Sequence, residues 1–139
     1  MVTPYRIYQQ HQVQNATRIE LLLGLYDKAI QHLTQARQEI DQGNVSMATP
    51  LILQAQVIVY ALAEGVDLQY GEIAQNMLRL YEFILYRLGS TDTHNIGDAI
   101  QVLTTLREGL WEIEPKAKAM ELGGKLPRAQ ALPGLRLSA

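Results

Sequence analysis

Apolar residues recur every three or four positions in four segments of this chain, at about 17–42, 49–66, 72–88 and 95–114. This period matches the ~3.6 residues of an α-helical turn and not the alternation of a strand. Thr17 followed by Glu20 is typical of a helix start, and Gly43 of a helix end. Because the connections between the segments are short, the sequence predicts an all-α fold, an antiparallel up-and-down four-helix bundle.

Each segment has one apolar stripe that we expect to face the core. In the first two segments the stripes are Ile19, Leu22, Leu23, Tyr26, Ala29, Ile30, Leu33, Ala36 and Ile40, then Leu51, Ala55, Ile58, Leu62 and Val66. In the third, the stripe is Ile73, Met77, Leu80, Ile84 and Leu88, widened by Tyr81, Phe83 and Leu85. In the fourth, it is Ile96, Ala99, Ile100, Leu103, Leu106, Leu110 and Ile113, with Trp111 at its edge.

Two prolines bear on the helix limits. Pro50 favours a second helix that starts with Thr49 as cap and Pro50 in the first turn, although a start at Asn44 stays open. Pro115 is expected to interrupt or end the fourth helix, with or without a short fifth helix after it. The predicted organisation is an N-terminal arm (1–16), the four-helix bundle (17–115), and a short helix with a flexible basic tail (116–139).

Charge is distributed unevenly along the 139 residues, whose formal net charge is −2. Residues 116–139 carry +4 and residues 1–115 carry −6. Affinity for duplex nucleic acid comes from neutralising phosphates over a basic face. We therefore expect no nucleic-acid partner.

Cysteine is absent, which excludes disulfides, thiolate zinc sites and a cysteine nucleophile. The first residues lack the basic and then apolar pattern of a signal peptide, and no later segment approaches ~18 uninterrupted apolar residues. We expect a cytoplasmic protein that is not membrane-embedded.

The chain offers no pattern for catalysis. Its histidines, His11, His32 and His94, share no spacing suited to a metal, and none has a glutamate three residues before it, as di-metal bundles do. Gly123-Gly124-Lys125 lacks the spacing of a phosphate-binding loop. We expect no enzymatic activity, no catalytic residue, no metal and no cofactor.

The second segment is apolar on more than one side. Leu53, Val57 and Tyr60 project opposite its core stripe, and the first segment repeats this more weakly with Leu21 and Leu25 near Gly24, where the missing side chain allows another backbone to approach. A bundle buries one stripe per helix, so a second stripe needs other cover. The arm, the tail or a second copy of the chain is one explanation, and a groove for a partner's amphipathic helices is the other.

The residues also resemble a known family through motifs that occur in order from Pro4 to Trp111. The motifs are Pro4-Tyr5 with Tyr8-Gln9-Gln10, Glu20-Leu21-Leu22-Leu23 with Leu25-Tyr26-Asp27-Lys28-Ala29-Ile30, Ala55-Gln56, Tyr70-Gly71-Glu72-Ile73-Ala74, Leu80-Tyr81-Glu82-Phe83, and Leu103, Leu106-Arg107 and Trp111. In these the chain resembles the flagellin-specific export chaperones of the flagellar type III secretion system.

This resemblance implies a non-enzymatic helical bundle that binds the C-terminal region of monomeric flagellin and prevents premature polymerisation. It also implies delivery of flagellin to the export gate of the flagellar export apparatus. In the family, the N-terminal arm is thought to lie over part of the binding surface until flagellin displaces it. By position, the resemblance assigns partner binding to Tyr5, Tyr8, Gln9, Leu23, Tyr26, Asp27 and Ile30.

Other readings stay open at this point. A homodimeric helical adaptor or scaffold without a flagellin role would use Leu53, Val57 and Tyr60 for self-association, so the chain is expected to be a monomer or a weak homodimer. A co-chaperone or regulator that shares the surface is a further open partner.

Overall fold

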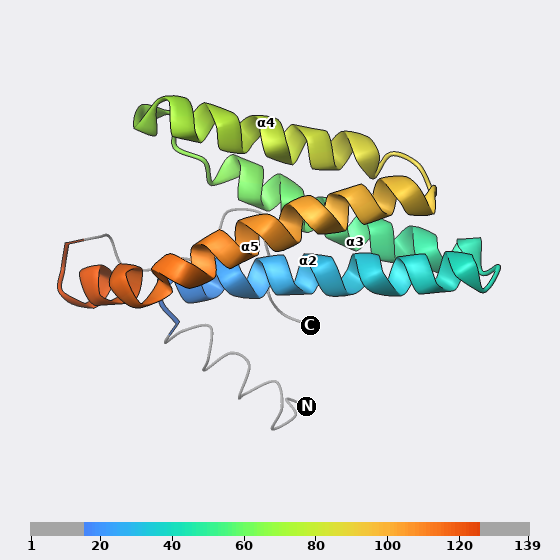
Figure 1. The fold of residues 1–139 in the computed structure, drawn as a ribbon, viewed down its shortest axis with the longest axis horizontal. Coiled ribbons are helices and arrows are strands. Elements are labelled where there is room, and N and C mark those ends of the chain that lie inside the picture. Colours follow the sequence, from blue (N-terminus) through green and yellow to red (C-terminus); the bar gives the residue numbers. More distant parts are fainter. Residues whose placement is uncertain (1–15, 126–139) are drawn as a thin grey trace, which may run out of the picture.

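The computed structural model of this chain describes residues 16–125, and within them it contains α-helices, one short 3-10 helix and no strand. The elements are α2 (Arg18–Asp41), α3 (Val45–Glu64), η1 (Leu68–Tyr70), α4 (Glu72–Arg87) and α5 (Thr93–Leu122). Successive helices run in opposite directions along the long axis (Figure 1). Both α2 and α4 pack against α3 and α5, so the predicted all-α bundle of four helices is confirmed.

The limits of α2 follow from its local sequence. The Thr17 hydroxyl accepts a hydrogen bond from the Glu20 backbone N–H, and the Glu20 carboxylate accepts one from the Thr17 N–H. At the other end Gly43 has a φ of 85°, and the N–H of Asn44 reaches back to the carbonyl of Glu39 at 2.7 Å. Both ends match the predicted capping box and glycine stop.

The start of α3 differs from the preferred prediction. The helix begins at Val45 and contains Pro50, so the prediction of a start at Thr49 with Pro50 in the first turn is wrong, and the alternative start at Asn44 is right. The Asn44 carbonyl already accepts the N–H of Ala48, which is fully buried in the core. Pro50 lies on the exposed side of α3, where water can solvate the carbonyl that it cannot bond.

The core is densest around α2, whose stripe is confirmed. Tyr26, Ala29, Leu33 and Ala36 are fully buried. Leu25, which the sequence places outside the core arc, is also buried, with 2% of its surface exposed. Because α2 is flanked by both α3 and α5, the neighbouring helices cover a wider arc than the stripe alone indicates.

Several residues predicted for the core lie at the surface instead. Ile73 is 75% exposed, and Leu80 and Phe83 on α4 and Ile113 on α5 are also exposed. In Figure 1, α5 begins beside the end of α4 and then crosses toward the start of α2. Because α5 leaves α4 along its course, part of the apolar side of each helix has no facing helix.

The helix α5 continues through Pro115 to Leu122, so residues 116–122 extend the same helix and do not form a separate one. Gly124, with a φ of 78°, ends it, and the N–H of Lys125 donates to the carbonyl of Met120 at 2.8 Å. Pro115 is exposed, so its missing N–H falls on the solvent side of the helix.

By length and hydropathy alone, α3 would qualify as a membrane-spanning helix. Core helices of soluble proteins meet the same criterion, and this one contributes Ile52, Ala55, Ile58, Val59 and Leu62 to the core. Its apolar character therefore reflects two apolar sides, of which the bundle covers one.

Candidate functional site

The first component of the candidate surface is the outer side of α3, formed by Leu53, Val57 and Tyr60 and here called the α3 outer face. Leu53 and Tyr60 are 59% exposed and Val57 is 50% exposed. Large apolar side chains grouped at this exposure mark interaction sites more often than isolated ones do. The residues that the sequence singled out for partner contact thus face solvent in the described part of the chain.

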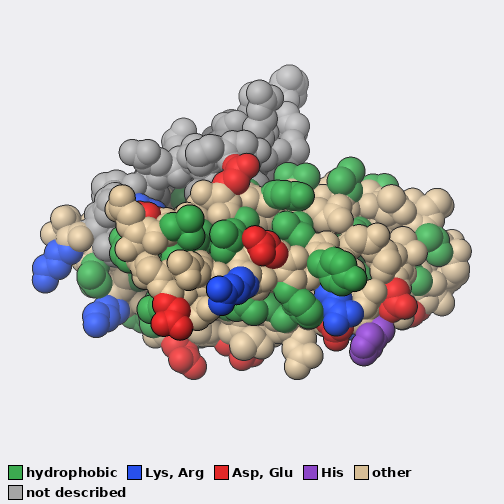
Figure 2. Space-filling view, turned by 90° about the horizontal axis from the view of Figure 1, so that it is seen from above, with side chains coloured by type: hydrophobic (Ala, Val, Ile, Leu, Met, Phe, Trp, Pro, Cys, Tyr) green, Lys and Arg blue, Asp and Glu red, His purple; other side chains and the backbone are tan. Residues whose placement is uncertain are grey.

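The second component is the exposed edge of α4 formed by Ile73, Leu80 and Phe83, here called the α4 edge. The Arg87 guanidinium lies 5.0 Å from the centre of the Phe83 ring, and Arg87 also donates to Asn95 on α5 at 3.0 Å. The α4 edge therefore borders α5 where the two helices meet. Figure 2, which looks from the side of α4, shows hydrophobic side chains along this face with single charged groups between them.

The structure exposes further large apolar residues on η1, α4 and α5. They are Leu68 and Tyr70 in η1, Tyr86 on α4, and Trp111 and Ile113 on α5. Sequence reasoning missed the α4 edge because its residues follow helical spacing and were assigned to the core. The signal available in the sequence was the width of the apolar stripe in this segment, which exceeds what one neighbouring helix covers.

Tyr26 lies inside the bundle and not on the candidate surface. Its hydroxyl is 2.5 Å from the hydroxyl of Tyr81, and both side chains are buried. Burial raises the pKa of both phenols, because the charged form would lose its hydration. This pair joins α2 to α4 through the core, as expected from the positions of both tyrosines in or beside the core arcs.

Asp27 lies at the contact between α2 and α5. Its carboxylate accepts two hydrogen bonds from the Arg107 guanidinium, the second from the terminal nitrogen at 3.3 Å. The hydrogen bond to Asp27 raises the pKa of Arg107. The same guanidinium lies 5.5 Å from the centre of the Trp111 ring. The ion pair between α2 and α5 is therefore next to an exposed indole.

The structure does not bring all the predicted binding residues together. Leu23 and Tyr26 are buried, Ile30 is half-buried, and Asp27 lies on the α5 side of α2. The α3 outer face is a separate part of the surface. Tyr5, Tyr8 and Gln9 lie outside the described residues.

The described residues offer little for metal or acid–base chemistry. Within residues 16–125, no group of three or more histidine or acidic side chains is placed to hold a metal ion. The His32 ring is partly buried, and this burial lowers its pKa, with a smaller contribution from Lys28. What the arrangement does provide is exposed apolar area, which suits binding of another chain.

Comparisons with known proteins agree with this character. Residues 1–117 match the family model described as flagellar protein FliS. The flagellar secretion chaperone FliS of Salmonella typhimurium is 31% identical over 115 residues, which cover 78% of this chain and 85% of the relative. The FliS of Bacillus subtilis is 28% identical over 92 residues (66% and 68%), and FliSB of Pseudomonas aeruginosa is 33% identical over 85 residues (60% and 68%).

Proposed function

Because this chain belongs to the FliS family of flagellar secretion chaperones, which are not enzymes, we propose that it binds the C-terminal region of monomeric flagellin in the cytoplasm. Binding keeps flagellin from polymerising prematurely, and the complex is then delivered to the flagellar export gate. The observation that carries this proposal is the exposure of Leu53, Val57 and Tyr60, an apolar face that the described bundle leaves uncovered.

The physical basis is temporary cover for an apolar segment. We expect the terminal region of flagellin to be disordered as a monomer and helical in the filament, so its apolar stripe needs protection before assembly. Wrapping this segment on the bundle buries apolar area, but ordering it costs about 2–5 kcal/mol. The resulting affinity protects the segment and still allows its release, and the binding step itself requires no ATP.

The two exposed apolar components differ in what they offer such a segment. The α3 outer face is a strip along one helix, suited to a single amphipathic helix laid parallel to it. From Phe83, near the contact with α5, the α4 edge extends toward the start of α4, and its residues Ile73 and Leu80 are available to a second part of the same segment. We propose that flagellin contacts both, with the α3 outer face as the main site.

The N-terminal arm is proposed to regulate access, with Tyr5, Tyr8 and Gln9 as its contacts. If the arm competes with flagellin, the apparent affinity is lowered by the fraction of molecules whose site is open. Deleting residues 1–15 should then raise or preserve flagellin affinity, measured by titration calorimetry. A large drop would show that the arm forms part of the site.

Co-purification with flagellin tests the proposal directly. Intact flagellin should be retained by the chaperone, and flagellin that lacks its C-terminal region should not. The matched control is a flagellin truncated by the same length elsewhere, which should still bind. Equal retention of intact and C-terminally truncated flagellin would refute the proposal, and a stable dimer by sedimentation that retains no flagellin would favour a scaffold role.

A further inference from the structure

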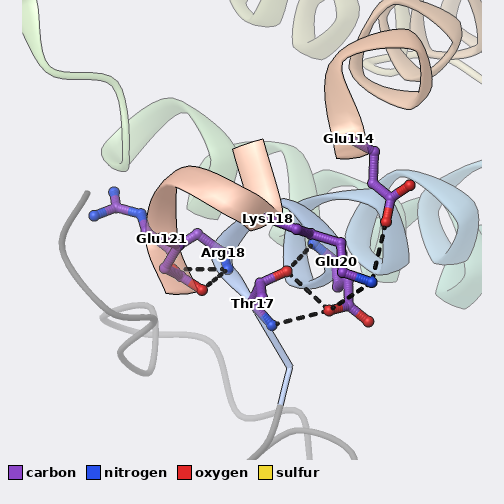
Figure 3. Close-up of polar contacts among 6 residues, drawn as sticks. All are labelled: Thr17, Arg18, Glu20, Glu114, Lys118 and Glu121. Carbon is purple, nitrogen blue, oxygen red and sulfur yellow. Dashed lines mark hydrogen bonds and ion pairs between the residues drawn. The ribbon is translucent and has the colours of Figure 1, made fainter. Parts of the chain in front are cut away.

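The end of α5 contacts the start of α2 through a group of polar side chains (Figure 3). The Arg18 backbone N–H donates to both carboxylate oxygens of Glu121, at 3.1 and 3.2 Å. Glu121 is only 3% exposed, which is unusual for a carboxylate. Its hydrogen-bond partner, Arg18, lies 103 residues earlier in the chain. Because burial removes water from the Glu121 carboxylate, we look for the interaction that compensates this loss.

That interaction is with the unpaired N–H groups of the first helical turn. A helix leaves its first four N–H groups without a carbonyl partner inside the helix. In α2 the capping box pairs the N–H groups of Thr17 and Glu20, and Glu121 pairs that of Arg18. A negative charge at this end also interacts favourably with the helix dipole. Glu121 thus adds, from another helix, a partner for an N–H group that the capping box of α2 does not pair.

A second contact holds the same two turns together. The Lys118 ammonium lies 3.6 Å from a carboxylate oxygen of Glu20 and 3.3 Å from one of Glu114. Glu20 therefore serves the capping box of α2 and pairs with α5 simultaneously, and these contacts lower its pKa, with the Thr17 hydrogen bond as the largest cause. The end of α5 and the start of α2 form one polar unit.

Lys118 and Glu121 lie beyond residues 1–117, the part that matches the family model. The N-terminal segment 1–15 joins the bundle immediately before this turn. We propose that Glu121 is a positioning residue that caps α2 from the end of α5, so that the last turn of α5 and the first turn of α2 open together. This inference rests on contacts within the chain and not on the identity of a partner.

The coupling must act in both directions. A substitution that destabilises the last turn of α5 should also destabilise the first turn of α2. A substitution that destabilises the first turn of α2 should likewise destabilise the last turn of α5. This reciprocity separates a coupled cap from two independent helix ends that happen to be close.

Residue-by-residue amide hydrogen exchange on the full chain tests the cap. Glu121→Met keeps most of the side-chain volume and removes the acceptor, so exchange at Arg18 and the next three residues should accelerate about fivefold to tenfold. Glu121→Gln keeps one acceptor oxygen without the charge and should stay within about threefold of the parent. Glu112→Met, at an exposed position on the same helix, is the control and should leave exchange in α2 unchanged.

The reciprocal variant is Thr17→Ala, which removes the local cap and should accelerate exchange at residues 119–122. It also decides the question should Glu121→Met fail to fold. Unchanged exchange at Arg18 in Glu121→Met, equal acceleration in Glu121→Met and Glu121→Gln, or unchanged exchange at residues 119–122 in Thr17→Ala would each overturn the proposal.

Discussion

The helices α2 and α4 have similar apolar stripes but are covered very differently. α2 lies between α3 and α5 and buries Tyr26, Leu33 and Ala36 completely. α4 contacts the same two helices, yet it leaves Ile73 and Leu80 exposed. The apolar pattern of a helix shows which side faces the bundle, whereas the course of its neighbours decides how much of that side is covered. We therefore expect substitutions around α2 to affect stability most, and the proposed function places partner binding on α3 and α4.

The largest expected effect is a loss of stability. It is tested by comparing an alanine substitution at a buried leucine of α2 with one at an exposed isoleucine of α4. Leu33→Ala removes a fully buried side chain and should lower the free energy of unfolding by about 2–5 kcal/mol, measured by urea denaturation. Ile73→Ala, at a 75% exposed position on α4, should change it by no more than about 0.5 kcal/mol. Similar losses in both variants would contradict the contrast between the helices.

The tyrosine pair tests how α4 is held to α2. Tyr26→Phe and Tyr81→Phe each leave the other buried hydroxyl without its partner, so each should cost about 1–3 kcal/mol of unfolding free energy. The double variant removes both polar groups and should cost less than the sum of the two single variants. Additive losses in this cycle would mean that the two hydroxyls do not interact.

The same pair predicts a pH dependence. Both folded-state pKa values lie above the ordinary tyrosine value, so the unfolded chain releases these protons first as the pH rises. Their stabilising contribution is complete below about pH 10 and should fall by up to about 1.4 kcal/mol per pH unit per tyrosine above it. The variant Tyr26→Phe/Tyr81→Phe should show a smaller slope between pH 10 and 11, and an unchanged slope would assign the loss to other groups.

The binding side of the comparison is tested on the two exposed surfaces. Val57→Asp should weaken flagellin binding about tenfold or more, with helicity by circular dichroism preserved, because it places a charge on an apolar contact face. Ile73→Asp should have a smaller effect if the α3 outer face is the main site. Gln54→Asp, at an exposed polar position on α3, is the control for added charge. An unfolded Val57→Asp variant would assign the α3 outer face to the core.

The smallest effect on stability is expected at the ion pair between α2 and α5. Asp27→Asn removes the charge that pairs with Arg107, and partly exposed ion pairs contribute about 0.2–1 kcal/mol. The loss should diminish at high salt. Thermal melts at low and high ionic strength measure this loss of stability. A loss comparable with that of Leu33→Ala would mean that the ion pair contributes as much to stability as a core side chain.

Much of the fold was readable from short stretches of sequence. Thr17 and Glu20 predict the start of α2, and Gly43 its end, because both signals act within one helical turn. The α3 outer face was predicted from periodicity, because a bundle helix is expected to bury one apolar stripe and leave a second one outside. The same periodicity assigned Ile73 to the core, because spacing alone does not reveal that α5 diverges from α4.

The sequence by itself determined the four long helical segments, the capped ends of α2 and the surplus apolar side of α3, because each depends on residues within a few turns of one another. The tertiary structure decided the continuation of α3 through Pro50, the burial of Leu25, the exposure of Ile73 and the pairing of Glu121 with Arg18. Each of these depends on where a distant helix lies. Local spacing fixes the direction of a side chain around its helix, and only the packed neighbour fixes what that side chain meets.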